Sequence, residues 1–268
     1  MGMSTALLDA WLEPTLTPAE RQWLAERCAA VRGGDRKALF LAFSSAARSC
    51  GHAPLGPPPA GLTVSGWSAD QAARVRLLLA LPTDDPMGFI ADLDRICNTA
   101  DVDELVAVYQ SLDLLPQAPR LRQRASEGIR SSMTAVFRAV ALDNPYPARW
   151  LDQGAWNQMV LKAVFTGSDL RRVVGLDARA NPTLARMAAD YVFERWAAKR
   201  TIDGQLWRVI GAGADVRGVA ALTRALGDRD PQTVSAAALA CQATPTLRAL
   251  CGAVAAAPSW AEVPGGSP

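Results

Sequence analysis

Apolar residues recur at helical spacing along most of the chain, and runs that alternate apolar and polar residues like β-strands are absent. Helix starts are marked repeatedly by a capping residue followed at once by proline. Proline suits the first helical position because its missing N–H would have no partner there. The pattern predicts an all-α fold of about a dozen helices. Five pairs follow this rule: Thr17-Pro18, Asp85-Pro86, Asn181-Pro182, Asp230-Pro231 and Thr244-Pro245.

Two segments have the form of helical hairpins. In 216–243 an apolar helix ends at Gly227 and a second helix begins after Asp230, which resembles a HEAT-type repeat. Segment 73–116 has a similar form, although the two segments share no strict period. We therefore expect an irregular, α-solenoid-like (HEAT-like) array.

Clusters of glycine and proline indicate the domain organisation. We expect N-terminal helices with a Pro/Gly-rich loop in 1–66, followed by a core helical region in 67–211. A C-terminal HEAT-like hairpin should occupy 212–257, and a flexible tail should occupy 258–268.

Composition and charge exclude several kinds of partner. The 268 residues carry a formal net charge of +2, and half of them are hydrophobic. This supports a substantial core and gives no electrostatic reason to expect a nucleic acid or a membrane surface. The longest apolar run is about half of the roughly 20 residues that a membrane span requires. With no targeting signal visible, we expect a soluble cytoplasmic protein.

The cysteines and the single histidine give little support for metal or disulfide chemistry. The five cysteines form no CxxC pair, and their odd number argues against a disulfide framework. We expect reduced thiols packed as small apolar residues. His52 lies in a Pro/Gly-rich loop, and no spacing brings several other metal ligands to it. We therefore predict a surface histidine, no metal site and no cofactor.

The stretch DNPYPARWLDQGAWNQMVLKAVFTG, residues 143–167, begins as a proline-rich turn and becomes a helix that is apolar around most of its circumference. Gln158 and Lys162 form its polar strip, whereas Asn157 falls inside the apolar arc. A buried amide without a partner costs about 1–3 kcal/mol. We favour a structural role for Asn157, holding a neighbouring helix end or the turn at 144–147, because most buried polar groups are satisfied within the protein. Ligand contact is the alternative.

The helix that follows Asn181 places Arg195 on an apolar face. A guanidinium in that position needs a carboxylate or another anion. Asp177 is the nearest candidate in the sequence, so a structural Arg195–Asp177 ion pair is favoured and a clamp on a ligand anion is the alternative. On the polar strip of the same helix, Arg186 and Asp190 have the spacing of an ion pair.

These two helices and their flanking turns combine apolar walls with a few polar groups, which is the usual composition of a ligand pocket. No catalytic residue is predicted from them. The candidate ligand-binding residues are Tyr146, Trp156, Asn157, Gln158, Lys162, Asp177, Arg195 and Trp196.

The same region carries a family resemblance. The run from ALDNPYPARWLDQGAWNQM to YVFERWAAKRTIDGQLWRVIG resembles the signature region of the EboA family. The upstream runs RVRLLLALP, ADVDELVAVYQSLDLLP and ASEGIRSSMTAVFRAVAL are also similar, so the resemblance covers 73–211. It supplies no catalytic residue. Family members often have Tyr-x-His-Glu-Arg-Trp where this chain has Phe193 before Glu194, so chemistry that used that histidine would be lost here.

The resemblance implies a bacterial protein of the ebo gene cluster, which is linked to making or exporting specialised metabolites. Two hypotheses follow. The first is a cytoplasmic accessory protein that binds a small-molecule pathway intermediate or another ebo-cluster protein. The alternative is an enzyme of undescribed type that acts on a prenyl- or cyclitol-like intermediate without metal or histidine. The chain lacks the GxGxxG, P-loop, GxSxG, HExxH and DDxxD motifs, which favours the first hypothesis.

Overall fold

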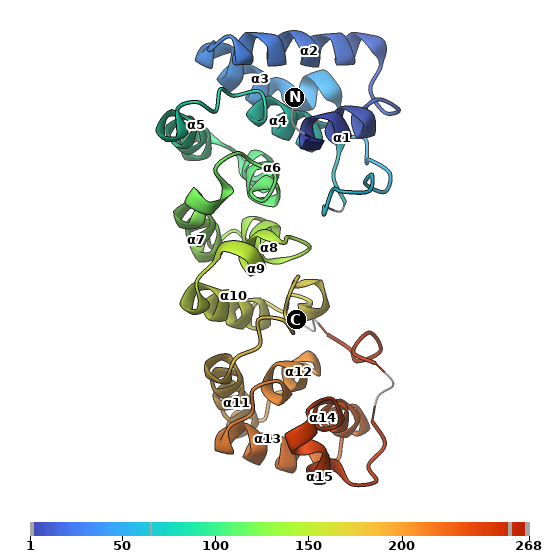
Figure 1. Cartoon of the computed structure of the whole chain (residues 1–268). Helices are drawn as coiled ribbons and strands as arrows, with labels where there is room; N and C mark the ends of the chain where they lie inside the picture. The colour runs from blue at the N-terminus through green and yellow to red at the C-terminus, as the bar shows by residue number, and fades with distance from the viewer. Residues whose placement is uncertain (1–2, 65, 257–258, 266–268) are drawn as a thin grey trace. The chain divides into compact units, whose positions relative to one another are not determined.

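The computed structural model describes residues 3–64, 66–256 and 259–265 (Figure 1). These residues form fifteen α-helices and no named strand, so the predicted all-α fold class is confirmed. The chain divides into two compact units, Met1–Trp150 and Leu151–Pro268, which are called unit 1 and unit 2 below. The four predicted domain divisions stay predictions.

Unit 1 consists of nine α-helices and one short 3-10 helix within its described residues. The helices are α1 (Met3–Leu12), α2 (Pro18–Arg32), α3 (Arg36–Cys50), α4 (Ala69–Leu78), α5 (Pro86–Thr99), α6 (Val102–Ser111), η1 (Ala118–Arg120), α7 (Arg122–Arg130), α8 (Thr134–Ala141) and α9 (Tyr146–Trp150).

Helix α4 is the central helix of unit 1, where it contacts α1, α2, α3 and α6 (Figure 1). Every residue of α4 except Gln71 is buried, including Asp70, Arg74 and Arg76. Charged residues are rarely this deeply buried unless they are paired. The core of unit 1 therefore contains charged groups that need partners.

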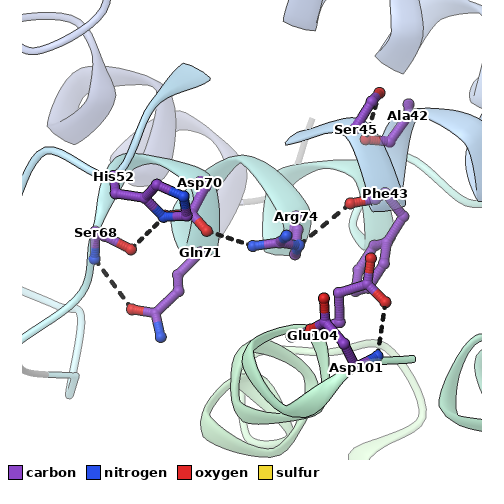
Figure 2. A network of polar contacts seen from close by, with 10 residues as sticks. All are labelled: Ala42, Phe43, Ser45, His52, Ser68, Asp70, Gln71, Arg74, Asp101 and Glu104. Carbon is purple, nitrogen blue, oxygen red and sulfur yellow. Dashed lines mark hydrogen bonds and ion pairs between the residues drawn. The ribbon is translucent and has the colours of Figure 1, made fainter. Parts of the chain in front are cut away.

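Figure 2 shows how Asp70 and Arg74 are satisfied. Arg74 donates to Asp70 through Nη1 and to the Phe43 carbonyl through Nε, the latter at 3.2 Å. The Ser68 hydroxyl donates to Asp70 at 2.5 Å, and His52, an exposed loop residue as predicted, lies 3.3 Å from the same carboxylate. Burial alone would raise the pKa of Asp70, but these hydrogen bonds and the charge of Arg74 together lower it. The network ties the loop before α4 to the helix.

Unit 2 contains six α-helices and two 3-10 helices in the part that the structure describes. They are α10 (Gln153–Phe165), η2 (Leu170–Arg172), α11 (Pro182–Ala197), α12 (Gln205–Gly211), α13 (Val216–Leu226), α14 (Pro231–Ala243), η3 (Pro245–Leu247) and α15 (Arg248–Cys251).

Helices α11 to α14 pack against one another in unit 2, and α10 contacts α11. The predicted hairpin is present: α13 ends just before Gly227, and Asp230 caps α14. Residues 259–265 lie against α12, because the buried Gln205 donates from Nε2 to the carbonyls of Trp260 at 2.9 Å and Val263 at 2.8 Å. The other residues of the predicted tail, 258 and 266–268, lie outside the described part of the chain.

The proline caps form as predicted at four of the five positions. Thr244 is the exception, because its hydroxyl donates to the Gly211 carbonyl at 3.0 Å, and the three-residue 3-10 helix η3 follows it. A tertiary contact therefore takes the group that would have capped a helix. The side chains that accept from first-turn amides are Thr17, Asp85, Asn181 and Asp230.

Two further predictions concern the thiols and the membrane. All five cysteines are free thiols, as predicted, and all except Cys97 are buried. Among the described residues, no helix is both long enough and apolar enough to cross a membrane.

Candidate functional site

The predicted site begins at the contact between α10 and α11 in unit 2. Asp152 caps α10 by accepting from the Ala155 amide at 2.8 Å, and Asn181 caps α11 by accepting from Leu184 at 2.9 Å. The exposed fraction of Trp156 is 0% and that of Asn157 is 4%. The apolar character of α10 thus places its polar Asn157 in the core.

Asn157 is satisfied by a reciprocal amide pair. Its Nδ2 donates to Asn181 Oδ1 at 3.2 Å, and Asn181 Nδ2 donates back to Asn157 Oδ1 at 2.9 Å. Asn181 also donates to the Arg179 carbonyl at 3.1 Å. Asn157 therefore fixes the residue that starts α11, which confirms the structural role predicted from its place on the helix.

The side chains of Trp156 and Tyr146 are buried and contact other residues of the protein. The Arg179 guanidinium lies 4.9 Å from the centre of the Trp156 ring and donates to the Leu151 carbonyl at 2.9 Å. Tyr146 belongs to unit 1, where its hydroxyl donates to the Ala118 carbonyl at 2.8 Å, and burial raises its pKa above the usual value. Both aromatic rings are enclosed by protein.

The predicted Arg195–Asp177 ion pair is wrong. Asp177 accepts from Arg208 of α12 instead, with Nε at 2.6 Å and Nη2 at 2.5 Å. Arg195 is half-buried, and its Nε donates to the Thr201 carbonyl at 2.9 Å while its guanidinium lies 5.8 Å from the centre of the Tyr191 ring. Asp177 was predicted as the partner of Arg195 because the two are close in the sequence. In the structure α12 brings Arg208, 31 residues further along, to the exposed Asp177.

The predicted Arg186–Asp190 pair is also absent among the described contacts. Arg186 pairs with Asp215 at 2.9 Å, and Asp190 pairs with Arg217 at 2.7 Å. Both partners belong to α13 or to its N-cap. Packing of α13 on α11 therefore replaces one pair within a helix by two pairs between helices.

Trp196 packs among side chains of three helices. Its ring centre lies 5.4 Å from Phe193 and 5.9 Å from Trp207 of α12, and the Arg224 guanidinium of α13 lies 4.1 Å from it. Gln158 is exposed and Lys162 is half-buried. None of these three predicted residues lines a pocket described below.

A pocket of about 290 Å³ lies where the C-terminal ends of α10 and α11 meet the start of α14 and the segment around Val263. Of the eight predicted site residues, only Arg195 lines it. Sequence reasoning missed the other lining residues because they come from five separate segments. They include Phe165, Tyr191, Thr201, Asp203, Asp230, Thr233 and Val263.

The charged side chains that line this pocket differ in how many of their polar atoms form hydrogen bonds. Asp230 accepts from the Thr233 hydroxyl at 2.7 Å and from the amides of Thr233 and Gln232, and these bonds lower its pKa, the hydroxyl most strongly. Arg195 uses Nε only, since its terminal nitrogens form no hydrogen bond to a described residue. The pocket can therefore offer two unused guanidinium nitrogens to an anion beside the rings of Phe165 and Tyr191, whose centres are 4.9 Å apart.

No group of three or more histidine, cysteine, aspartate or glutamate side chains in the described residues is arranged to hold a metal ion. The fold is all-α, and its candidate pocket is lined by a guanidinium, two carboxylates, two aromatic rings and two hydroxyl-bearing threonines.

Comparison with known proteins identifies the family. The chain belongs to the EboA family, described as metabolite traffic protein EboA, whose model matches residues 4–211. Tyr191, Arg195 and Thr201 lie within the match, whereas Asp230 and Val263 lie beyond it. No curated protein and no solved structure matches the chain.

Proposed function

We propose that this protein is a cytoplasmic accessory protein of metabolite traffic in the ebo cluster, and that it binds a small pathway intermediate in the Arg195 pocket. The family description supports a role in traffic. The observation that carries the proposal is Arg195 itself, which lines a pocket while both terminal nitrogens lack a described hydrogen-bond partner.

The pocket chemistry indicates the class of ligand. A guanidinium binds carboxylate or phosphate oxygens through two parallel hydrogen bonds, which a lysine ammonium does not reproduce. Phe165, with an exposed fraction of 60%, and Tyr191 supply apolar surface next to it. An intermediate with one anionic group and a small apolar part fits these features.

Native mass spectrometry tests this role. The protein would be co-expressed with its neighbouring genes, and the intact mass would be compared among wild type, Arg195→Met and the matched control Arg200→Met, which changes an exposed arginine outside the pocket. We expect a retained small molecule in wild type and Arg200→Met, and its loss from Arg195→Met. Equal retention by both variants, or no retained mass in wild type, would contradict the pocket assignment.

The same measurement detects the second form of an accessory role, which is a stable complex with a neighbouring protein. If such a complex formed without a small molecule and Arg195→Met left it unchanged, the ligand of this protein would be a protein partner and not a pathway intermediate.

A further inference from the structure

A second pocket lies entirely within unit 1. It has a volume of about 380 Å³ and is formed by α1, the turn after α1, and one face of α2, with Arg76 of α4 beside them. On α2 the lining residues recur at the spacing of a single helix face. The apolar lining includes Leu12, Leu16, Leu24, Ala25 and Cys28.

Arg76 is the group that distinguishes this pocket. Its side chain is 7% exposed, and its Nε donates to Asp9 Oδ1 at 2.6 Å. Neither terminal nitrogen has a hydrogen-bond partner among the described residues. These two nitrogens are not enclosed by protein, so they remain accessible from the pocket. Arg74 on the same helix shows the satisfied case, because it bonds both Asp70 and a carbonyl.

The other charges around the pocket leave it cationic. Arg21 donates to the Glu13 carbonyl at 3.1 Å and lies 3.8 Å from the Glu13 carboxylate, and Asp9 faces Arg76. Arg32 also lines the pocket and forms no ion pair with a described residue. The three arginines thus outnumber the two carboxylates by one.

Cys28 adds an apolar, uncharged surface at the base. Its Sγ lies 3.7 Å from the Arg76 carbonyl, and its exposed fraction is 1%. Burial raises the pKa of this thiol to about 11, although the charges of Arg76 and Arg32 oppose the effect. At neutral pH the thiol therefore brings no negative charge to the pocket.

We propose that this pocket binds a small amphiphile: its anionic head, a carboxylate or a phosphate monoester, is held by the terminal nitrogens of Arg76 with Arg32 nearby, and its apolar part lies on Leu12, Leu16 and Leu24. A guanidinium whose terminal donors reach the pocket and bond no described residue, beside an apolar surface, matches both parts of such a molecule. The site is independent of the Arg195 pocket, since it shares no residue with it.

Isothermal titration calorimetry of the full chain tests the ligand class with octanoate, mono-octyl phosphate and octylammonium. These probes share an eight-carbon chain and differ in the head group. We expect at least one of the two anions to bind, and octylammonium to bind at least about tenfold more weakly. The ratio of the two anion affinities then identifies the head group. Equal binding of octylammonium, or no binding of either anion at millimolar concentration, would overturn the proposal.

Matched variants test the location without relying on a buried charge. Ala25→Phe should fill the pocket and abolish anion binding, whereas Ala29→Phe, on the same helix but outside the pocket lining, should leave it unchanged. Arg76→Lys keeps the charge beside Asp9 but loses the planar fork, and should weaken anion binding at least about tenfold. Arg195→Met should have no effect. Full anion binding by Ala25→Phe would place the ligand elsewhere and overturn the proposal.

Discussion

Arg76 in unit 1 and Arg195 in unit 2 both line pockets, and their terminal nitrogens bond no described residue, yet they are held in different ways. Arg76 is buried on a core helix and has one carboxylate partner, Asp9. Arg195 is half-exposed and donates to a backbone carbonyl. The terminal nitrogens of both arginines can be reached by water, so an anion would replace water at either site. The two sites differ in the charges around the guanidinium: Arg76 shares its pocket with two further arginines, whereas Arg195 shares its pocket with two carboxylates, Asp203 and Asp230.

The helices that carry these arginines show the same contrast. The charges of α4 lie in the core and are tied to α1 and α3, while those of α11 lie at the surface and pair with α13. Loss of the partner of a buried charge strongly lowers the free energy of unfolding, whereas loss of a surface ion pair changes it little. Each prediction below tests that distinction.

The largest effect is expected at Arg74. Arg74→Met leaves Asp70 buried, at 1% exposure, without its main counter-charge, and should lower the free energy of unfolding by about 3–5 kcal/mol. Arg195→Met, which removes a single bond from a half-exposed arginine, should change it by less than about 1 kcal/mol. Urea denaturation measures both. Similar losses in the two variants would show that burial does not separate the two arginines.

The next largest effect is expected for Asn157→Ala, which should lower the free energy of unfolding by about 1–3 kcal/mol. Asn181 loses a buried partner in this variant while it still caps α11. Gln158→Ala changes the next residue, an exposed one, and should melt with the wild type. Differential scanning calorimetry would compare the two. If Asn157→Ala also melted with the wild type, the amide pair would contribute nothing to stability.

Burial in unit 1 keeps thiols neutral, and this effect has a pH signature. Burial raises the pKa of Cys50 to about 12 from an ordinary value of 9.0. Above pH 9 the unfolded chain releases a thiol proton that the folded chain retains, so this contribution is fully present below pH 9 and is lost as the pH rises toward 12. At pH 10 the loss should reach about 1 kcal/mol.

Cys50→Ala isolates that contribution. The free energy of unfolding would be measured at pH 8 and pH 10, and the decline between them should be smaller in the variant. An unchanged decline would assign the alkaline loss to other groups.

The smallest effect is expected at the surface of α11. Asp190 is about half exposed and pairs with Arg217, so Asp190→Asn should lower the free energy of unfolding by about 0–1 kcal/mol, and the difference should vanish at high salt. Denaturation with urea at two salt concentrations checks this. A larger, salt-independent loss would mean that α11 depends on its surface pairs as α4 depends on its buried ones.

Signals that act over a few residues predicted the fold well. Four of the five proline caps, the hairpin around Gly227 and the burial of Asn157 follow from residues close together in the sequence, and the structure contains each of them. Partners from other helices were beyond this reasoning, because sequence distance gives no measure of spatial distance. The pairing of Asp177 with Arg208 could not be predicted for that reason, and neither could the hydrogen bond from the Thr244 hydroxyl to the Gly211 carbonyl.

The candidate site was predicted only in part for the same reason. Arg195 was identified because a charge on an apolar face is visible in one helix, but most of its pocket comes from loops and from other helices, among them α10 and α14. The pocket at Arg76 was missed entirely. RVRLLLALP does place two arginines in an apolar helix, which is a usable signal, but Asp9 and the lining face of α2 come from the first 32 residues.

The two carbonyls bound by Gln205 bear on how the protein is made on the ribosome. Each helix of unit 1 has a packing partner within unit 1, so these helices can pack once residue 150 has emerged. Gln205 must wait for Trp260 and Val263, which are 55 and 58 residues further along. Until they emerge, α12 carries an amide that the nascent chain leaves to water, so unit 2 should complete its fold only after residue 263 has emerged.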